Sequence, residues 1–303
     1  MAEKNHNHEE LAGAKFFWVT VLNVVITIAE FIGGALSGSL SLISDAFHNA
    51  GDSVSIVFSY AASRISKRRQ NGRNTFGYKR AEIIAAFLNS IALALICVIL
   101  IIEALKRISK PEPINGNLML TIAVIGLAAN LLSAFLLNSG SKSSLNMKAT
   151  YLHILSDALS SVAIIIGGIL IDLYNWTLVD PIVTVLVAVY IFYESIPIIR
   201  QTCRILMQGA PSLDYDQIKK DLLQIDGVFS VHHVHAWSID ENNVIFSAHV
   251  NMHDMKLSEA EPIYSEISKV LKDKYHMCHV TIQAETTRGE HEDIIYDRGN
   301  DIP

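Results

Sequence analysis

Cysteine is scarce in this sequence, with three residues in a chain of 303. Cys97, Cys203 and Cys278 lack the close spacing of a metal-binding or redox motif, so we expect a reducing compartment and no disulfide. Charge is scarce too: only 18% of the residues are charged, against about 25% in ordinary soluble domains. The net charge of −6 argues against nucleic acid as a partner. With half of its residues hydrophobic, the chain is too apolar for an ordinary soluble domain.

Long apolar runs fill the first two-thirds of the chain. A helix needs about 20 residues to cross the hydrocarbon core of a bilayer, and six stretches are long enough: Phe16–Leu36, Leu40–Ser63, Ala81–Leu105, Asn117–Asn138, Ala149–Asp172 and Leu178–Ile199. The sequence therefore predicts a membrane α-helical domain over residues 16–199. The start, "MAEKNHNHEE", has no basic segment or cleavage site, so residues 1–15 are expected to be a tail rather than a signal peptide.

The basic residues of the loops predict the orientation. They cluster after the second, fourth and sixth spans, at Arg64, Lys67, Arg68, Arg69, Arg73, Lys79, Arg80, Lys142, Lys148, Arg200 and Arg204. The opposite side carries only Lys106, Arg107 and Lys110. The positive-inside bias places both termini in the cytosol.

Two of the spans carry ionisable side chains at matched spacing. In "LISDAFHNAGDSVS", Asp45, His48 and Asp52 are three and four residues apart and share one helical face. In "ATYLHILSDALSS", His153 and Asp157 repeat the pair. Because ionised groups are costly inside a membrane, such residues face the bundle interior and find partners there. We expect the two pairs to meet.

Two imidazoles and two carboxylates suit Zn²⁺, which takes nitrogen and oxygen ligands in tetrahedral geometry. The two aspartates balance the charge of the ion. Because the ligands must lose their protons to bind metal, protons and metal compete for the site, which is the basis of an exchange mechanism. A closed set of four ligands leaves no position for an activated water, so hydrolysis is not expected.

The polar residues of the spans have other interpretations. A single histidine in a span is often only hydrogen-bonded packing, but the duplication favours a metal site. Asp45 either acts as a gate or outer partner of the site or fixes the start of its helix. Glu30, with Asn23, is favoured as a polar contact in the bundle over part of a proton path. A haem protein with His48 and His153 as axial ligands leaves the aspartates unexplained, and a metalloprotease lacks an HExxH motif.

The segment from residue 200 to 290 is predicted to be a soluble domain, followed by a tail at 291–303. Its pattern indicates helix Asp214–Gln224, strand Val228–Ile239, strand Val244–His253, helix Ser258–Tyr275 and strand His279–Glu285. Trp237 is expected in the core. His6 and His8, at the other end of the chain, are not expected to form a site.

The motifs "SGSLSLISDAFHNAGDS", "NTFGYKRAEIIAAFLNS", "HILSDALSSV", "VDPIV" and "VHHVHAW...HVTIQAE" resemble the cation diffusion facilitator family, in its branch of zinc, cobalt and cadmium resistance exporters. The resemblance covers residues 16–285. It implies a homodimer in a membrane, expected to be the bacterial inner membrane, whose subunits each have six spans and a cytosolic αββαβ, ferredoxin-like domain. It implies an antiporter, not an enzyme, that exports divalent metal in exchange for H⁺, and it leaves open whether K⁺ is exchanged as well.

The resemblance also assigns residues. It carries the transport ligands onto His48, Asp52, His153 and Asp157, with histidine at the first position as in zinc-preferring members. It carries cytosolic ligands for regulatory Zn²⁺ onto His232, His249 and Glu285, while other ligand positions hold Glu261, Cys278 and Gln283; His235, His276 and His279 are weaker candidates. No prosthetic group is implied. A further site of some members falls on Asn71, Asn74 and Tyr78, where we predict no metal.

Overall fold

The computed structural model describes residues 2–141, 145–289 and 291–295, with side chains for 18–136, 151–289 and 291–295. Contacts divide the chain into two compact units, one of residues up to Ala61 and Ala85–Ile199, the other of Ala62–Ile84 and the residues from Arg200 onwards. His6, His8, Lys142 and Lys148 lie outside the described side chains.

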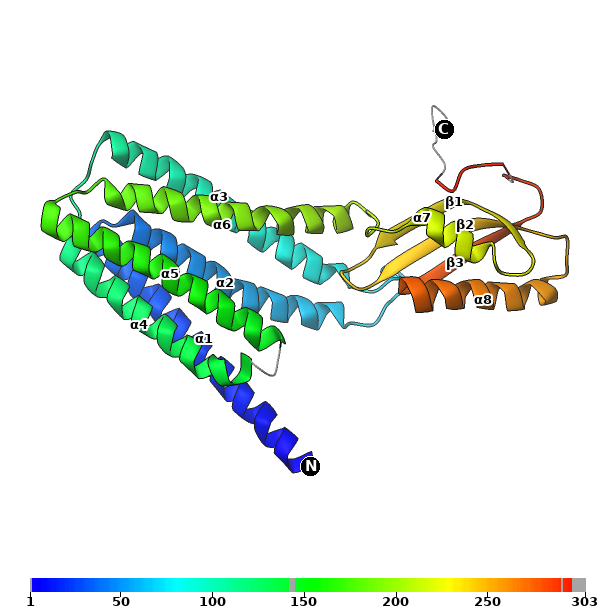
Figure 1. The fold of residues 1–303 in the computed structure, drawn as a ribbon, viewed down its shortest axis with the longest axis horizontal. Helices are drawn as coiled ribbons and strands as arrows, with labels where there is room; N and C mark the ends of the chain where they lie inside the picture. The colour runs from blue at the N-terminus through cyan, green and yellow to red at the C-terminus, as the bar shows by residue number, and fades with distance from the viewer. Residues whose placement is uncertain (1, 142–144, 290, 296–303) are drawn as a thin grey trace. The chain divides into compact units, whose positions relative to one another are not determined.

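Six long helices make up the first part of the chain: α1 (Ala2–Ser37), α2 (Leu40–Ser66), α3 (Arg80–Ser109), α4 (Gly116–Ser141), α5 (Leu145–Tyr174) and α6 (Val179–Leu206). Five of the predicted spans fall within one of these helices each, and the sixth, Leu178–Ile199, begins one residue before α6. Helix α1 begins at Ala2, so the backbone of the predicted N-terminal tail is helical and leads directly into the first span. Figure 1 shows α1, α4 and α5 side by side.

Five of these helices are long and apolar enough to cross a membrane, all except α2. The exception has a physical reason, because α2 carries Asp45, His48 and Asp52 together with several serines. At 27 residues it is about 40 Å long, more than the thickness of a hydrocarbon core. Only Gly38 and Ser39 separate it from α1, so the chain turns back at once into α2.

Apolar contacts hold the helices around this polar α2. Leu42 of α2 packs with buried residues of α4 and α5, among them Met119 and Ile164. On its other side, Ile43 and Phe47 pack against a cluster that joins α3 and α6, built on Cys97, Leu100, Ala188 and Ile191. The two clusters fix α2 between the other helices, and its ionisable side chains are thereby held inside the bundle.

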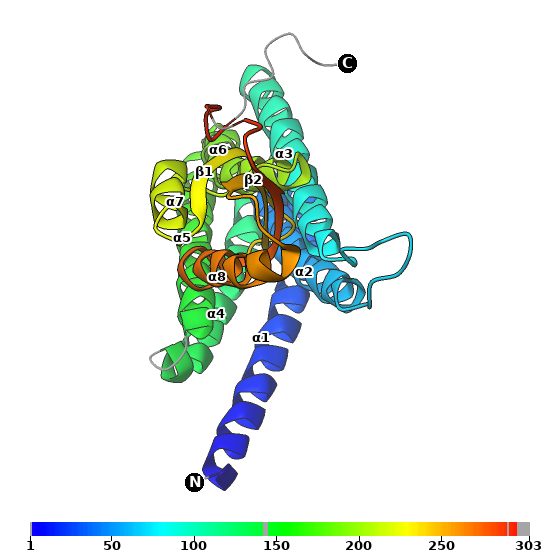
Figure 2. The ribbon, with the colours of Figure 1, turned by 90° about the vertical axis from the view of Figure 1, so that its right-hand side faces the viewer.

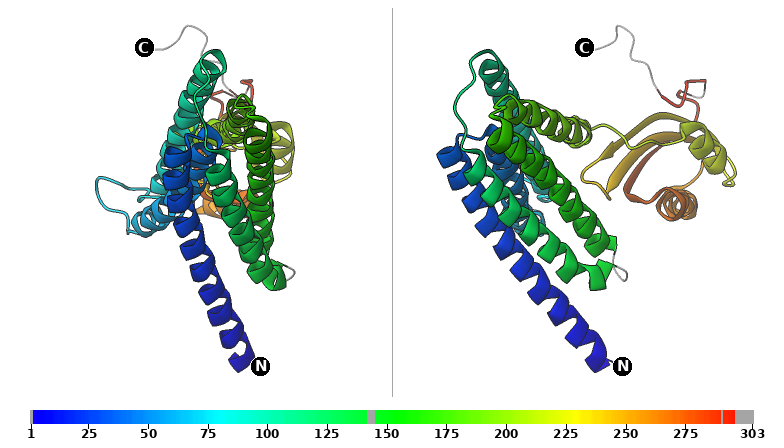
Figure 3. Two further views of the ribbon diagram at one scale, coloured as in Figure 1. Left: turned by 90° about the vertical axis from the view of Figure 1, so that its left-hand side faces the viewer. Right: turned by 60° about the vertical axis from the view of Figure 1, so that its left-hand side comes forward.

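The second unit contains the predicted αββαβ order, with α7 (Tyr215–Leu222), β1 (Val228–Ser238), β2 (Val244–Met252), α8 (Leu257–Tyr275) and β3 (Met277–Glu285). The sheet order is β1-β2-β3, with β1 antiparallel and β3 parallel to β2. Figures 2 and 3 show the sheet with α7 and α8 on one side of it. The predicted fold class, a helical membrane domain followed by a small α+β domain, is confirmed.

The core of this domain lies between the sheet and its two helices. Ile218 and Leu222 of α7 and Ile267 and Leu271 of α8 meet alternate residues of the strands, Val231, Phe246, Ala248 and Val250 among them. Trp237 is not one of the buried residues, so its predicted core position is wrong. Side chains that alternate with the core residues, such as His232 and His249, point to the other face of the sheet.

Candidate metal-binding sites

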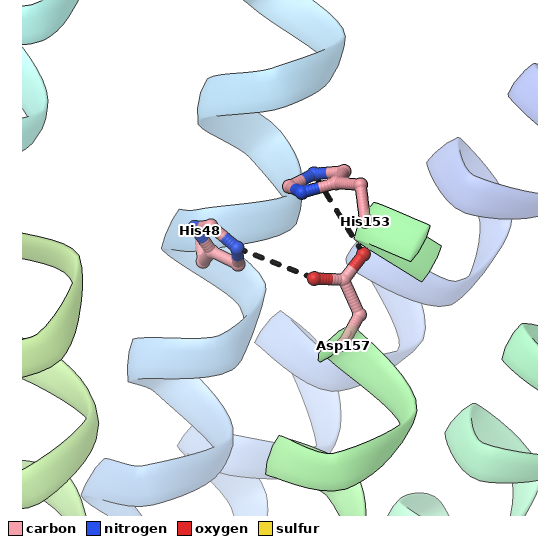
Figure 4. A group of neighbouring side chains, drawn as sticks. All are labelled: His48, His153 and Asp157. Atoms are coloured by element: carbon pink, nitrogen blue, oxygen red, sulfur yellow. Dashed lines mark ion pairs between the residues drawn. The ribbon is translucent and has the colours of Figure 1, made fainter. Parts of the chain in front are cut away.

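The four ionisable residues of α2 and α5 come together, as their spacing predicts. Nε2 of His48 lies 3.4 Å from Oδ1 of Asp157 and 3.8 Å from Oδ2 of Asp52. Nε2 of His153 lies 2.9 Å from Oδ2 of Asp52 and 3.8 Å from Oδ2 of Asp157. Figure 4 shows His48 on α2 facing His153 and Asp157 on α5. Each imidazole thus has one carboxylate from its own helix and one from the other.

These separations suit a tetrahedral ion. Ligand atoms at about 2.1 Å from Zn²⁺ lie about 3.4 Å from one another, and the four nitrogen–oxygen distances span 2.9–3.8 Å. The candidate ligand atoms of His48, His153 and Asp157 all lie within 4.8 Å of one another. Asp52 approaches both imidazoles but falls outside this tighter group of three.

One side of the cluster is more open than the other. The side chains of Asp157 and His48 are 9% and 15% exposed, whereas those of Asp52 and His153 are 31% and 44% exposed. A cavity of about 90 Å³ borders Asp52, His153 and Asp157. Its other lining residues come from α1, α2, α4 and α5 and include Thr20, Asn23, Asn130 and Ser133. Polar groups therefore line an approach to the cluster from within the bundle.

Two further carboxyl groups, those of Asp45 and Glu30, are buried in the same helical bundle. Asp45 is 1% exposed and accepts a hydrogen bond of 2.7 Å from the Ser160 hydroxyl, which ties α2 to α5 one turn from His48. Glu30, also 1% exposed, accepts a hydrogen bond of 2.9 Å from the side-chain amide of Asn49, which ties α1 to α2. Both carboxyl groups join helices of the bundle.

A second cluster lies on the face of the sheet opposite α7 and α8. His232 of β1 pairs with His249 of β2, and Glu285 of β3 pairs with Asn251, two residues further along β2. This register brings the three predicted side chains to one face. Nε2 of His232 is 3.3 Å and Nδ1 of His249 is 3.2 Å from the Glu285 carboxylate. The candidate ligand atoms again lie within 4.8 Å of one another.

The chain after β3 covers this cluster, and we call residues 286–289 and 291–294 the strap. The buried Asn251 amide donates hydrogen bonds to the carbonyl oxygens of Thr286 (3.3 Å) and Arg288 (2.9 Å). The strap thereby reaches His232, which is only 1% exposed. A Cβ atom at Gly289, where φ is +67°, would lie 2.1 Å from Nε2 of His232. Only glycine fits this position without a shift of the strap or of the imidazole.

Two buried polar atoms of the cytosolic cluster lack a hydrogen bond within the described residues. They are Nδ1 of His232 and Oε2 of Glu285. Oε2 of Glu285 still lies within ion-pair distance of Nε2 of His232, at 3.3 Å, so the two groups share one buried contact. Two imidazoles and a carboxylate are suitable ligands for a borderline cation such as Zn²⁺.

Comparison with known proteins places the chain in a family. Residues 16–207 match the cation efflux transmembrane domain, and residues 210–287 match the cytoplasmic domain of cation efflux proteins. The chain belongs to the cation efflux family. Members of this family are membrane transporters with a cytoplasmic domain. The interpretations as a haem protein and as a metalloprotease are therefore set aside.

Several cation efflux proteins of bacteria are similar to this chain over almost its whole length. The cadmium, cobalt and zinc/H⁺-K⁺ antiporter of Bacillus subtilis is 37% identical, over 96% of this chain and 94% of the relative. Zinc transporter ZitB of Escherichia coli is 36% identical, over 93% and 90%. The metal cation efflux system protein CzcD of Cupriavidus metallidurans is 34% identical, over 95% and 92%.

The sequence did not indicate the role of one residue that fixes a helix of the membrane domain. Asp180, at the start of α6 and fully buried, accepts hydrogen bonds from the backbone N–H of Leu40 (2.8 Å) and of Ser41 (3.2 Å). The hydroxyl groups of Ser39 and Ser41 also donate to it, each at 2.6 Å. Asp180 therefore fixes the start of α2, the role that was one alternative for Asp45. The motif "VDPIV" marks the residue, but a carboxylate that caps a helix 140 positions away has no local signal.

The remaining candidates of the cytosolic domain lie apart from the cluster or only at its edge. Gln283 donates a hydrogen bond of 2.7 Å to Oε1 of Glu285 and so orients that carboxylate. Cys278 donates through its Sγ to the Val244 carbonyl oxygen, and burial raises the pKa of this thiol. His276 ends α8 in the left-handed region at φ 54°. Within the described residues, the groups that could hold a metal do not include Glu261, His235, His276 or His279.

The loop between α2 and α3 is held by its own side chains. Asn71 donates a hydrogen bond of 2.9 Å to the Tyr78 hydroxyl, and its side-chain oxygen accepts from the backbone N–H of Asn74 at 2.9 Å. The three residues at which we predicted no metal thus stabilise a turn.

Proposed function

We propose that this chain exports Zn²⁺ from the cytosol in exchange for protons, at a site formed by His48, Asp52, His153 and Asp157. The observation that carries the proposal is the approach of each imidazole to carboxylates of both α2 and α5, at 2.9–3.8 Å. Two carboxylates and two neutral imidazoles neutralise the charge of a divalent ion, which makes it tolerable in a medium of low dielectric constant.

Protons are the counter-ions because the same groups bind them. Zn²⁺ requires neutral imidazole and ionised carboxylate, so loading from the cytosol displaces protons. When the site faces outwards, the higher proton concentration there reprotonates the ligands and releases the metal. Alternating access between the two states couples the flows.

The metal and counter-ion range follows from ligand chemistry and from the names of the relatives. Imidazole and carboxylate accept Co²⁺ and Cd²⁺ as well as Zn²⁺, and the Bacillus subtilis relative is named for cadmium, cobalt and zinc with H⁺ and K⁺. We extend the proposal to these metals as secondary substrates. K⁺ is the second counter-ion to be tested.

Asp45 is proposed as an outer partner of the transport site. It lies one turn before His48 and bonds Ser160, one turn beyond Asp157. A change in the separation of α2 and α5 must stretch this hydrogen bond, so the pair links the geometry of the site to the movement of the helices.

The cytosolic cluster of His232, His249 and Glu285 is proposed as a regulatory Zn²⁺ site in a homodimer. The candidate ligand atoms of the three residues, all within 4.8 Å of one another, support it, and so does the match to the cytoplasmic domain of cation efflux proteins. In this proposal residues 16–199 transport and residues 200–290 sense metal, in a bacterial inner membrane with both termini in the cytosol.

The proposal is tested by Zn²⁺ uptake into inside-out proteoliposomes with an acidic lumen. The native protein should accumulate Zn²⁺, and Asp157→Ala should not. The matched control is Glu194→Gln, which removes one carboxylate from the exposed side of α6 and should transport normally. Equal uptake by the native protein and Asp157→Ala would show that transport does not use the intramembrane site.

A further inference from the structure

A cavity separate from both metal clusters lies in the second unit. It measures about 500 Å³, within the range of small-molecule binding sites. Its walls are residues 73–79 of the loop, Arg80, Ala81 and Ile84 of α3, and Gln208, Trp237 and Ile239 of the cytosolic domain. We call it the loop cavity. It shares no residue with the two clusters, and the proposed function makes no use of it.

Cationic side chains line the loop cavity, and carboxylates do not. Arg73, Lys79 and Arg80 are among its lining residues, which include no Asp or Glu. Only Lys79 has an ion-pair partner, Asp240 at 3.9 Å, and this lysine is half exposed, so the pair is weak. Arg73 and Arg80 form no ion pair within the described part of the chain. Two unpaired guanidinium groups are suited to the oxygens of a phosphate.

Hydrogen bonds within the loop fix the backbone that carries these cationic residues. The backbone groups of Asn71 and Asn74 bond each other in both directions at 3.1 Å, and Gly77 donates to the Asn74 carbonyl oxygen at 3.0 Å. Gly77 has a φ of +74°, which a residue with a side chain rarely adopts. The backbone N–H of Arg73 donates to the Asn71 side chain at 3.0 Å. The backbone position of Arg73 is thus fixed by the loop itself.

The covalent chain puts the loop cavity at the surface of the membrane. Arg80 is the first residue of α3, which crosses the membrane, so its guanidinium group lies at the level of lipid headgroups. Ile84 is one turn further along, about 6 Å deeper, and faces the same cavity. Phe76 and Trp237 complete an aromatic wall, as is common at membrane interfaces. The cavity is therefore cationic at its rim and apolar towards the membrane.

We propose that the loop cavity binds the headgroup of an anionic phospholipid, with its phosphate on Arg73 and Arg80 and its chains against Ile84, Phe76 and Trp237. A soluble phosphate would use the cationic rim only. A phospholipid uses both the rim and the apolar wall, and α3 already brings the site to its headgroups.

Native mass spectrometry of the full-length protein, with added phosphatidylglycerol or phosphatidylcholine, tests the proposal without reference to transport. The native protein should retain phosphatidylglycerol in preference to phosphatidylcholine. The variant Arg73→Gln with Arg80→Gln should bind it about 25-fold more weakly, since each basic residue contributes about fivefold. The matched control, Lys67→Gln with Arg69→Gln, removes the same charge from the same loop outside the cavity and should bind as the native protein does.

The source of the phosphate is tested with Trp237 as a probe. In a variant carrying Trp18→Phe and Trp176→Phe, phosphatidylglycerol with brominated chains should quench the fluorescence of Trp237, and glycerol 1-phosphate should not displace it. Equal weakening in the control variant, no preference for the anionic lipid, absence of quenching, or displacement by glycerol 1-phosphate would each overturn the proposal.

Discussion

The carboxylate of Asp52 on α2 lies 2.9 Å from Nε2 of His153 on α5. Of the four nitrogen–oxygen contacts in the cluster this is the shortest, and it joins the two helices rather than neighbours on one helix. A charge-assisted contact of this kind is directional and strong. In the proposed transporter, Asp52 and His153 contact each other when metal is absent and coordinate the ion when it binds.

The identity of residue 48 should set the preference for metal. His48→Asp replaces an imidazole with a third carboxylate, which favours harder cations such as Mn²⁺ and gives the loaded site a net negative charge. We expect Zn²⁺ uptake to fall about tenfold or more relative to Mn²⁺ uptake. Competition assays in proteoliposomes measure the ratio. An unchanged ratio would show that His48 does not select the metal.

The hydrogen bond between Ser160 and Asp45 should stabilise the bundle. Ser160→Ala removes the donor and leaves the Asp45 carboxylate buried without it, at a cost of about 1–3 kcal/mol. The second variant Asp45→Asn, alone and combined with Ser160→Ala, completes a double-mutant cycle of thermal unfolding in detergent. We expect the effects of the two substitutions on unfolding to be coupled, and simple additivity would contradict this expectation.

Asp180 should contribute more to the stability of the bundle than an acidic residue that caps no helix. Asp180→Asn weakens four hydrogen bonds at the start of α2 and should lower the unfolding temperature clearly. Asp172→Asn, at the exposed end of α5, is the control and should leave it unchanged. Similar unfolding temperatures for the two variants would mean that the cap adds little to the stability of α2.

Gly289 should control the cytosolic cluster. A methyl group there meets Nε2 of His232, so Gly289→Ala should weaken Zn²⁺ binding at this cluster several-fold. Binding is best measured in the Asp157→Ala background, so that the transport site contributes little. Gly72→Ala, where an added Cβ meets nothing within 4 Å, is the control. Native affinity in Gly289→Ala would show that the strap is free to move away.

Asp221 gives the cytosolic domain an acid-sensitive contact. Hydrogen bonds from Lys274 and then Tyr275 lower the pKa of this carboxyl group from 3.8 to about 2. A depressed pKa contributes stability that is present above the unfolded value and is lost as pH falls towards the folded one. Asp221→Asn should therefore lower the unfolding temperature at pH 7, with a difference that narrows below about pH 4. The exposed Asp216→Asn is the control, and a gap that does not change with pH would contradict the assignment.

Sequence patterns predicted the architecture because its signals are local. Apolar length marks the spans, and four-residue spacing puts His48 beside Asp52 and His153 beside Asp157. That the two pairs meet followed from the cost of isolated charges in a membrane. The positions of the cytosolic residues depended on resemblance, because strand register is needed to bring His232, His249 and Glu285 together.

The features that were missed depend on tertiary contacts. The capping of α2 by Asp180 and the position of Gly289 over His232 join segments far apart in sequence, and neither has a local pattern. Trp237 was wrongly expected in the core because its size, and not its surroundings, was the only available guide. The side of a strand that a helix covers cannot be told from one aromatic residue.

Exchange of Zn²⁺ for protons can be observed as a change of pH in the lumen of proteoliposomes. Proteoliposomes of inside-out protein, with equal pH on both sides, without K⁺ and with a pH dye in the lumen, are given external Zn²⁺. The account predicts that Zn²⁺ uptake makes the lumen alkaline, because protons leave as the metal enters, and that Asp157→Ala abolishes both changes. Zn²⁺ uptake by the native protein with no change in lumenal pH would contradict exchange with protons at the intramembrane site.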